Sequence, residues 1–385
     1  MESRTNGPVL AAAFIGMAFF GVAFVVMGAV LPSLIARFSL DTATASTLAG
    51  LLPLGILLGS MLFGPVIDRY GYKNLMITAS IIAVIGLEML AFCTKIGEIR
   101  FSIFIIGLGG GVLNGLTNAL VSDVSSDHSR ASNLSILGIF YTIGAITIPL
   151  LFASLTKTIF YSPIVAGAGI LMAFSVIYYL SVTFPTAKYK QGFPLKKIFE
   201  MAKEPTILIL SFALFFQSGL EGISNNWTPS YMELSKGFPS ETALYALSFI
   251  VIGMGVGRLL LSFLLRKIPK ITLLTISMLI AAVGVIILSL YDTASTAIAG
   301  TFLMGFGLAS TFPIILGEIG ERYKDISGTA FSFALVIALT GNTLLNLLVG
   351  VIDLEAFPVL VVACTFMIAL LYSVNNRYQI HLKNK

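Results

Sequence analysis

The stretch that decides the fold is Gly64-Pro65-Val66-Ile67-Asp68-Arg69-Tyr70-Gly71-Tyr72-Lys73. The apolar segment 42–67 runs into it, and a second apolar segment, 74–94, follows it. The glycines allow two helices to approach closely and the chain to turn tightly. Asp68 can accept hydrogen bonds from a neighbouring helix N-terminus or from a cation. Because this spacing is more specific than an ordinary basic loop, it indicates two membrane helices joined by a structured turn.

The composition is that of a membrane protein. Of the 385 residues, 57% are hydrophobic and 11% are charged, whereas soluble domains carry about 25% charged residues. A helix needs about 20 apolar residues to cross the hydrocarbon core. Nine charge-free segments reach that length, and three more contain one charge each; in chain order they are 9–36, 42–67, 74–94, 101–122, 131–156, 158–187, 205–232, 242–265, 271–291, 293–317, 326–352 and 356–376. The sequence predicts an all-α integral membrane fold with twelve transmembrane helices.

The distribution of Lys and Arg predicts the orientation in the membrane. Segment 9–36 is too long for a signal-peptide core and is the first span. With both termini inside, 17 of the 23 Lys and Arg residues fall in inner segments and five in outer loops. The positive-inside rule therefore predicts cytoplasmic termini in the cell (inner) membrane. The net charge of +5 reflects this topology, so we expect no nucleic-acid partner.

The chain divides into two similar halves. Its longest internal hydrophilic stretch, 185–204, separates six spans from six, which predicts an N-terminal bundle (1–184), a cytoplasmic linker (185–204) and a C-terminal bundle (205–385). A shift of 198 residues brings nine like pairs into register: Gly55/Gly253, Gly59/Gly257, Arg69/Lys267, Leu75/Leu273, Ala83/Ala281, Gly86/Gly284, Gly107/Gly305, Gly109/Gly307 and Asp123/Glu321. Parallel six-helix halves are typical of alternating-access carriers.

Glu221 is the main candidate functional residue. A charged side chain at mid-bilayer depth costs at least about 3 kcal/mol, so an ionisable residue there indicates function. Gln217, Glu221 and Asn225 recur at i, i+4 spacing and share one helix face. Asn226, Trp227 and Tyr231 follow, while two further amide pairs lie in other spans: Asn114 with Asn118, and Asn342 with Asn346. These groups match sugar hydroxyls, and an indole suits a sugar's C–H face. The Asn pairs could equally be interhelical hydrogen bonds.

No cofactor, metal or enzymatic chemistry is expected. The sequence has two histidines and two cysteines, with no zinc spacing, nucleotide loop or catalytic triad pattern. Cys93 and Cys364 fall inside spans and are interpreted as small apolar residues. Glu88, which has no polar neighbour at i±3 or i±4, is interpreted as a structural contact rather than a coupling residue.

The loop 64–73 resembles the signature loop of the major facilitator superfamily, G-x-x-x-D-R-x-G-R-K, with Tyr72 where Arg is commoner. The resemblance implies two pseudo-symmetric six-helix bundles that rock about a central site. It also implies a cytoplasmic gating network, for which the candidates are Asp68, Arg69, Lys73, Asp123, Arg258, Glu321 and Arg322. Arg258, inside a span, could instead be a snorkelling side chain.

Over its full length the chain also resembles the fucose–proton symporter and bacterial glucose permease branch. The resemblance rests on Gly219-Leu220-Glu221, Asn226-Trp227 and Tyr231, on Gly253–Gly257-Arg258, and on Gly305–Ala309 with Phe312-Pro313. It implies a monosaccharide symporter coupled to H⁺ or Na⁺. The branch's acidic residue in the first span is missing here, and its acidic position in the fourth is matched by Asn114. Proton coupling through that pair therefore does not carry over, which leaves Glu221 as the leading proton site.

We therefore expect a secondary transporter that moves a monosaccharide or small sugar derivative by alternating access and acts as a monomer among membrane lipids. The alternatives are a drug or metabolite exporter of the same fold, an uncoupled sugar uniporter, and a non-transporting sensor. Exporters often carry an Arg-Gly pair in the fourth span, whereas here that span is rich in Gly and Asn and has no Arg.

Overall fold

The computed structural model describes residues 7–125, 130–155, 158–185, 201, 203–265, 267–323 and 327–383. Within these ranges the side chains of 63–70, 130–132, 135, 262–263, 327–329, 332 and 382–383 are not described. The described residues include twelve helical segments that are long and apolar enough to cross a membrane. The prediction of twelve spans is confirmed.

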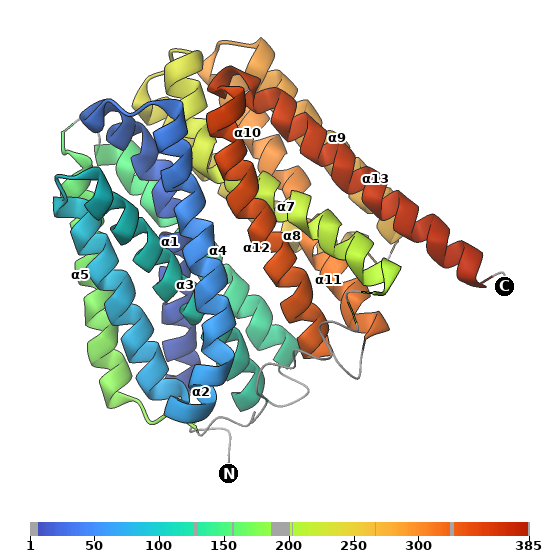
Figure 1. Ribbon diagram of the computed structural model, residues 1–385, viewed down its shortest axis with the longest axis horizontal. Coiled ribbons are helices and arrows are strands. Elements are labelled where there is room, and N and C mark those ends of the chain that lie inside the picture. Colours follow the sequence, from blue (N-terminus) through green and yellow to red (C-terminus); the bar gives the residue numbers. More distant parts are fainter. Residues whose placement is uncertain are drawn as a thin grey trace. The chain divides into compact units, whose positions relative to one another are not determined.

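The N-terminal helices are α1 (Gly7–Phe38), α2 (Thr42–Phe92), α3 (Ile96–Val124), α4 (Arg130–Leu155) and α5 (Tyr161–Ser181) (Figure 1). Helix α2 contains two spans, Thr42–Leu62 and Gly71–Phe92. They meet at Gly71, whose φ of 74° and ψ of 171° interrupt the helix. A residue with a side chain rarely adopts this φ, so the turn predicted in loop 64–73 depends on this glycine.

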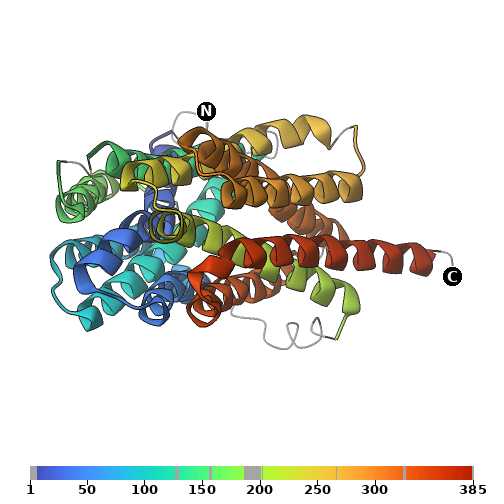
Figure 2. The same ribbon diagram turned by 90° about the horizontal axis from the view of Figure 1, so that it is seen from above.

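The C-terminal helices are α7 (Pro205–Ser230), α8 (Ser240–Leu264), α9 (Lys270–Leu290), α10 (Ala294–Leu308), α11 (Thr311–Arg322), α12 (Ser327–Ile352) and α13 (Phe357–Lys383). A π-helical turn, η1 (Tyr231–Ser235), continues α7, and a 3₁₀ turn, η3 (Leu354–Ala356), precedes α13. Helix α13 runs without interruption to the C-terminal end of the described chain (Figure 2).

Contacts divide the chain into two units. The N-terminal unit holds Met1–Leu40 and Leu51–Phe193, and the C-terminal unit holds Asp41–Gly50 and Pro194–Lys385. The first part of α2 is thus grouped with the C-terminal helices. Most of the proposed linker, 185–204, lies outside the described residues, so the boundaries at 184 and 205 stay a prediction.

The 198-residue repeat reappears in the internal packing of each unit. An added Cβ at Gly55 would overlap the carbonyl oxygen of Phe104, and an added Cβ at Gly253 would overlap that of Phe302. Both members of the second contact lie 198 residues after those of the first. Three more contacts with a backbone oxygen follow the same rule: Gly59–Leu108 and Gly257–Phe306, Gly107–Leu52 and Gly305–Ile250, and Gly109–Ala79 and Gly307–Ser277. Glycine lets these helix backbones approach closely in both units.

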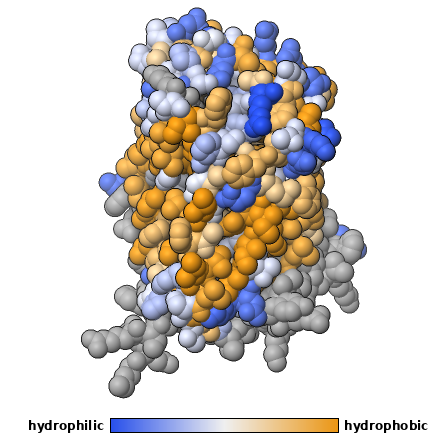
Figure 3. Space-filling view, turned by 90° about the vertical axis from the view of Figure 1, so that its left-hand side faces the viewer, coloured by the Kyte–Doolittle hydropathy of each residue, from blue (hydrophilic) through white to orange (hydrophobic). Residues whose placement is uncertain are grey.

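The outer surface of the N-terminal unit suits a lipid environment. The face in Figure 3 is mostly hydrophobic across its middle, and hydrophilic residues gather toward its upper end. Along α5 most exposed side chains are large and apolar; they include Ile170, Leu171, Phe174, Ile177 and Leu180. A contiguous apolar surface of this kind would be costly in water and is satisfied by hydrocarbon.

Candidate polar site on helix α7

The predicted stripe on α7 begins at a helix interruption. Gln217 is fully buried, and its Nε2 donates a 3.2 Å hydrogen bond to the carbonyl oxygen of Leu308. Leu308 is the last residue of α10, and α11 starts three residues later. Pro313 contributes to this interruption because it has no N–H to offer the carbonyl four residues earlier. Gln217 thus donates a hydrogen bond to the backbone at the break between α10 and α11. Substrate sites of transporters are commonly built at such breaks in a helix.

The same stretch of α7 has several unfilled hydrogen-bonding atoms. Four buried side-chain oxygens have no hydrogen-bond partner among the described residues: Gln217 Oε1, Ser224 Oγ, Asn225 Oδ1 and Thr228 Oγ1. Buried polar atoms are normally paired, so each needs an explanation. These four atoms lie within twelve residues of one helix and are candidate hydrogen-bond partners for a bound molecule. Ser224 and Thr228 were not predicted, although their spacing from Glu221, i+3 and i+7, was visible in the sequence.

Glu221 lies in the same stretch and interacts electrostatically with a cation from another helix. Its side chain is partly buried, and Arg258 of α8 is close enough to act on its charge. The Nε of Arg258 is itself buried without a hydrogen-bond partner among the described residues. The sequence suggested a cytoplasmic gating role for Arg258. That role stays a prediction, and the nearness of this guanidinium also offers the Glu221 carboxylate a counter-charge where the dielectric is low.

Asn226 and Trp227 face away from this stripe. The Asn226 Nδ2 and the Trp227 Nε1 both donate to Oδ1 of Asn346 on α12, at 3.0 and 3.1 Å. Asn346 in turn donates to Asn342 Oδ1 at 2.9 Å, and Asn342 Nδ2 reaches Ser218 Oγ at 3.5 Å. All five residues are buried, Trp227 completely. We call these five residues the α7–α12 network. Asn342 and Asn346 thus form hydrogen bonds between α12 and α7, which is the alternative that the sequence analysis gave for this pair.

Glycine brings α7 and α12 close enough for this network. An added Cβ at Gly222 would overlap the Oδ1 of Asn342, and one at Gly219 would overlap Leu345. Farther along, Tyr231 is buried, and its ring contacts the tilted ring of Phe357 on α13, with centroids 5.2 Å apart. The sequence predicted substrate-binding roles for Asn226, Trp227, Tyr231 and Asn342. In the structure these four side chains pack inside the C-terminal unit, and the binding roles stay a prediction.

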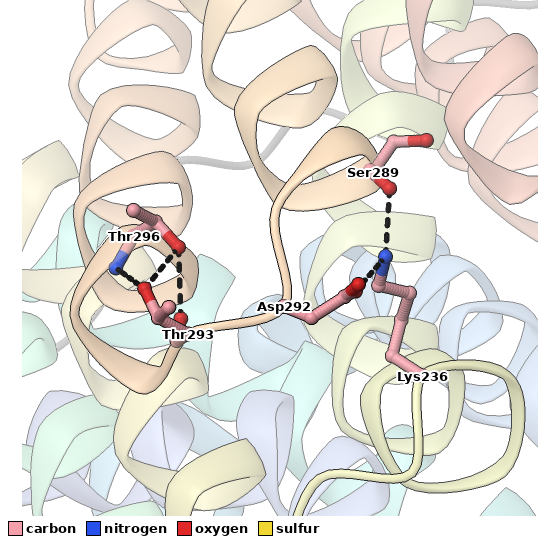
Figure 4. Close-up of polar contacts among 5 residues, drawn as sticks. All are labelled: Lys236, Ser289, Asp292, Thr293 and Thr296. Carbon is pink, nitrogen blue, oxygen red and sulfur yellow. Dashed lines mark hydrogen bonds and ion pairs between the residues drawn. The ribbon is translucent and has the colours of Figure 1, made fainter.

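The C-terminal end of α7 and its π-helical continuation are held by an ion pair. Lys236, which follows η1, pairs with Asp292 and donates a 2.7 Å hydrogen bond to the carbonyl oxygen of Ser289 (Figure 4). Next to it, Thr293 caps α10 by accepting a 3.3 Å hydrogen bond from the backbone N–H of Thr296. The π-helical end of α7 is thus tied to the α9–α10 connection.

The predicted amides of the N-terminal unit lie on α3. Asn118 Nδ2 donates to the backbone oxygen of Asn114 at 2.9 Å and to its side-chain oxygen at 3.2 Å. Asn114 is partly exposed and Asn118 is exposed. In contrast with the α7–α12 network, this pair is bonded within its own helix and presents its remaining polar atoms at a surface.

The gating candidates make contacts at the predicted inner ends of the helices. In the N-terminal unit, Lys73 donates to the carbonyl oxygen of Leu180 at 2.6 Å, and the hydroxyl of Tyr72 lies 2.8 Å from Asp123 Oδ2. In the C-terminal unit, Glu321 pairs with Lys270 at 2.8 Å.

Arg322 makes two further contacts at the predicted inner end of the C-terminal unit. It lies 3.5 Å from Glu204 and donates to Gln379. The side chains of Asp68 and Arg69 lie outside the described residues, so their role stays a prediction.

Glu88 packs against another helix, α5. Its Oε1 is buried without a hydrogen-bond partner among the described residues and occupies space that an added Cβ at Gly169 would need. This contact agrees with the structural interpretation of Glu88.

A family model that describes the Major Facilitator Superfamily matches residues 13–374, nearly the whole chain. The chain belongs to this superfamily. With its twelve membrane-spanning helices it is a multi-pass membrane transporter, as the loop 64–73 indicated.

Relatives within the superfamily differ in their named substrates. The chain is 25% identical over 356 residues to the glucose/mannose transporter GlcP of Bacillus subtilis (strain 168), an alignment that covers 87% of this chain and 86% of the relative. It is 22% identical to the putative niacin/nicotinamide transporter NiaP of the same organism, covering 95% and 93% of the two chains.

Solved superfamily structures share the fold. The D-xylose-proton symporter superposes with a TM-score of 0.78 at 15% identity, covering 94% of this chain and 97% of that one. The nucleoside transporter NupG superposes with a TM-score of 0.79, also at 15% identity, covering 97% and 100%. At such low identity the likeness establishes the architecture alone.

Proposed function

We propose that this superfamily member carries a monosaccharide or a small sugar derivative across the cell inner membrane. The observation that carries the proposal is the α7 stripe, where unpaired buried oxygens of Gln217 and Asn225 flank Glu221. Sugar hydroxyls donate and accept hydrogen bonds at once, so they can fill such acceptors. The full-length relative named for glucose and mannose transport supports the same substrate class.

Glu221 is proposed to couple transport to a cation, with H⁺ as the first candidate. A carboxylate beside Arg258 has two stable arrangements. It can pair with the guanidinium, or it can take up a proton and release it. Because a substrate hydroxyl would compete for the same carboxylate, occupancy of the site and ionisation of Glu221 become linked. Na⁺ coupling and uniport are the competing modes.

The test is uptake of radiolabelled glucose, mannose and xylose into proteoliposomes under an imposed pH gradient, an imposed Na⁺ gradient, or neither. We expect sugar accumulation driven by the pH gradient. Glu221→Gln should lower that accumulation about tenfold or more, because it removes both the titratable group and a charged hydrogen-bond acceptor. Glu88→Gln is the matched control, since it changes a carboxylate inside a span of the other unit and should transport normally.

Each outcome assigns the mechanism. Undiminished proton-driven accumulation by Glu221→Gln would rule out the coupling role. Accumulation that follows only the Na⁺ gradient would make Na⁺ the coupling ion in place of H⁺. Equilibration of the sugar without accumulation would indicate a uniporter. If no sugar enters but a lipophilic drug is extruded, the protein is an exporter.

The proposed orientation has both termini in the cytoplasm, and the proposed state is a monomer. The basis is the excess of Lys and Arg in segments expected inside. A C-terminal green fluorescent protein fusion should fluoresce, while a C-terminal alkaline phosphatase fusion should be inactive. Light scattering of the detergent-solubilised protein should give the mass of one 41.1 kDa chain.

A further inference from the structure

The N-terminal unit contains a cluster of three aromatic side chains from two helices. Phe20 and Phe24 come from α1, and Tyr141 comes from α4. The ring centroids lie 5.9 Å apart for Phe20–Phe24, 5.6 Å for Phe20–Tyr141 and 6.1 Å for Phe24–Tyr141. We call these three side chains the aromatic patch.

Phe20, within the aromatic patch, lies on the side of α1 that faces α3. An added Cβ at Gly110 of α3 would be 3.5 Å from the Phe20 ring. Two turns farther along α3, Thr117 approaches Gly16 of α1, with 3.1 Å between the Thr117 methyl group and an added Cβ. Asn114 lies between these two contacts, one turn after Gly110, and therefore borders the same crossing.

Phe24 is at the edge of this contact rather than inside it. Gly21 faces α4, because an added Cβ there would overlap the backbone of Tyr141. Phe20 faces α3, and at 100° per residue Phe24 falls between the two directions. Phe24, Tyr141 and Asn114 are all partly exposed, so each can be reached from outside the unit.

The repeat of the fold does not require these aromatics. A shift of 198 residues brings Phe20 onto Ser218, Phe24 onto Gly222, and Gly110 onto Leu308. At the equivalent crossing of the C-terminal unit the side chain that reaches Leu308 is the amide of Gln217. The same backbone arrangement is thus lined by hydrogen-bonding groups in one unit and by aromatic rings in the other.

We propose that the aromatic patch and Asn114 form a carbohydrate-contact surface whose ligand is the apolar C–H face of a sugar ring. This inference rests on the proposed function of sugar transport and adds a binding surface in the N-terminal unit to it. Aromatic rings stack on the C–H face of a pyranose, while the Asn114 amide can bond a hydroxyl at the ring edge. The surface accordingly selects rings over open-chain polyols, which have the hydroxyls but no flat apolar face.

Phe24→Ala tests the proposal, with glucose uptake and its competition by sorbitol as readouts in proteoliposomes. We expect KM for glucose to rise about 5- to 20-fold, since stacking and buried apolar area are lost. Inhibition by sorbitol should change less than twofold, so discrimination between ring and polyol should fall. Phe24→Tyr, which keeps an aromatic ring, should leave the KM for glucose close to that of the unmodified protein. Phe14→Leu is the control, because Phe14 stacks on Phe140 across the same two helices, ten residues from Phe24.

A binding measurement keeps the test independent of transport rate. Trp227 is the only tryptophan, so Trp227→Phe combined with Phe24→Trp places a single indole in the aromatic patch. Saturating glucose should shift or quench its emission, and sorbitol should not.

Unchanged glucose KM in Phe24→Ala, or an indole at position 24 that does not respond to glucose, overturns the surface while leaving sugar transport intact. Absence of sugar uptake by the unmodified protein overturns both proposals.

Discussion

Trp227 donates its indole N–H to the side-chain oxygen of Asn346, 3.1 Å away on the neighbouring helix α12. The same oxygen also accepts from Asn226 at 3.0 Å, so a single acceptor satisfies two buried donors. Both donors come from the helix that carries Glu221. The hydrogen bonds of Asn346 therefore help to set the rotation of α7 about its own axis.

Asn346→Ala should destabilise the protein by about 1–3 kcal/mol, because it leaves the Asn226 and Trp227 donors unpaired in the interior. The measurement is thermal unfolding in detergent, followed by Trp227 fluorescence. Asn118→Ala is the control, since this exposed amide bonds only within its own helix among the described contacts. Equal melting temperatures for the two variants would show that the α7–α12 network contributes little.

The glycines at helix crossings should tolerate no side chain. Gly305→Ala would bring a methyl group onto the carbonyl oxygen of Ile250 and should lower stability by about 2 kcal/mol or more. Gly317→Ala has open space around the added methyl and should be neutral or stabilising by up to about 1 kcal/mol. Melting temperatures of the pair in one detergent check this. Similar melting temperatures for the two variants would show that the close approach to Ile250 does not limit position 305.

Tyr72 should matter through its hydroxyl. It is almost completely buried, and its oxygen lies 2.8 Å from Asp123 Oδ2. Tyr72→Phe keeps the ring and should cost about 1–2 kcal/mol, as expected for a hydrogen bond to a charged group. Asp123→Asn retains an acceptor and should cost less. A double-mutant cycle on melting temperature isolates the pair, and strictly additive effects would show that the two side chains are not coupled.

Asp41 should make the start of α2 sensitive to acid. Hydrogen bonds from the side chain and the backbone N–H of Thr44 hold the pKa of Asp41 below its usual value of 3.8. A group whose pKa is depressed by folding stabilises the protein above its unfolded pKa and loses that contribution as the pH falls through the folded value. The stability difference between the unmodified protein and Asp41→Ala should therefore shrink below pH 3.8.

Melting curves between about pH 3 and 6 measure this difference. Asp41→Asn caps the helix without titrating and should keep a constant advantage over Asp41→Ala across the range. A difference that grows as the pH falls would contradict the assignment.

The membrane architecture was readable from the chain itself. Twenty-residue apolar segments have no alternative to helices in a bilayer, because every backbone polar group must be bonded within the segment. The positive-φ turn at Gly71 and the glycine pairs 198 residues apart were likewise visible, since close backbone approach demands glycine at particular positions. Local chemistry dictates each of these features, so the sequence determined the twelve spans, the repeat and the superfamily.

Which polar side chains share a surface was decided only by the tertiary structure. Asn225 and Asn226 are neighbours in one apolar span, yet one has an unpaired oxygen beside Glu221 and the other is bonded to Asn346. Nothing in their local sequence separates them. The rotation of α7 is set where Gly219 and Gly222 meet α12, and the Glu221–Arg258 association depends on where α8 lies. Spacing along a helix establishes which residues share a face, but only packing against neighbouring helices decides what that face meets.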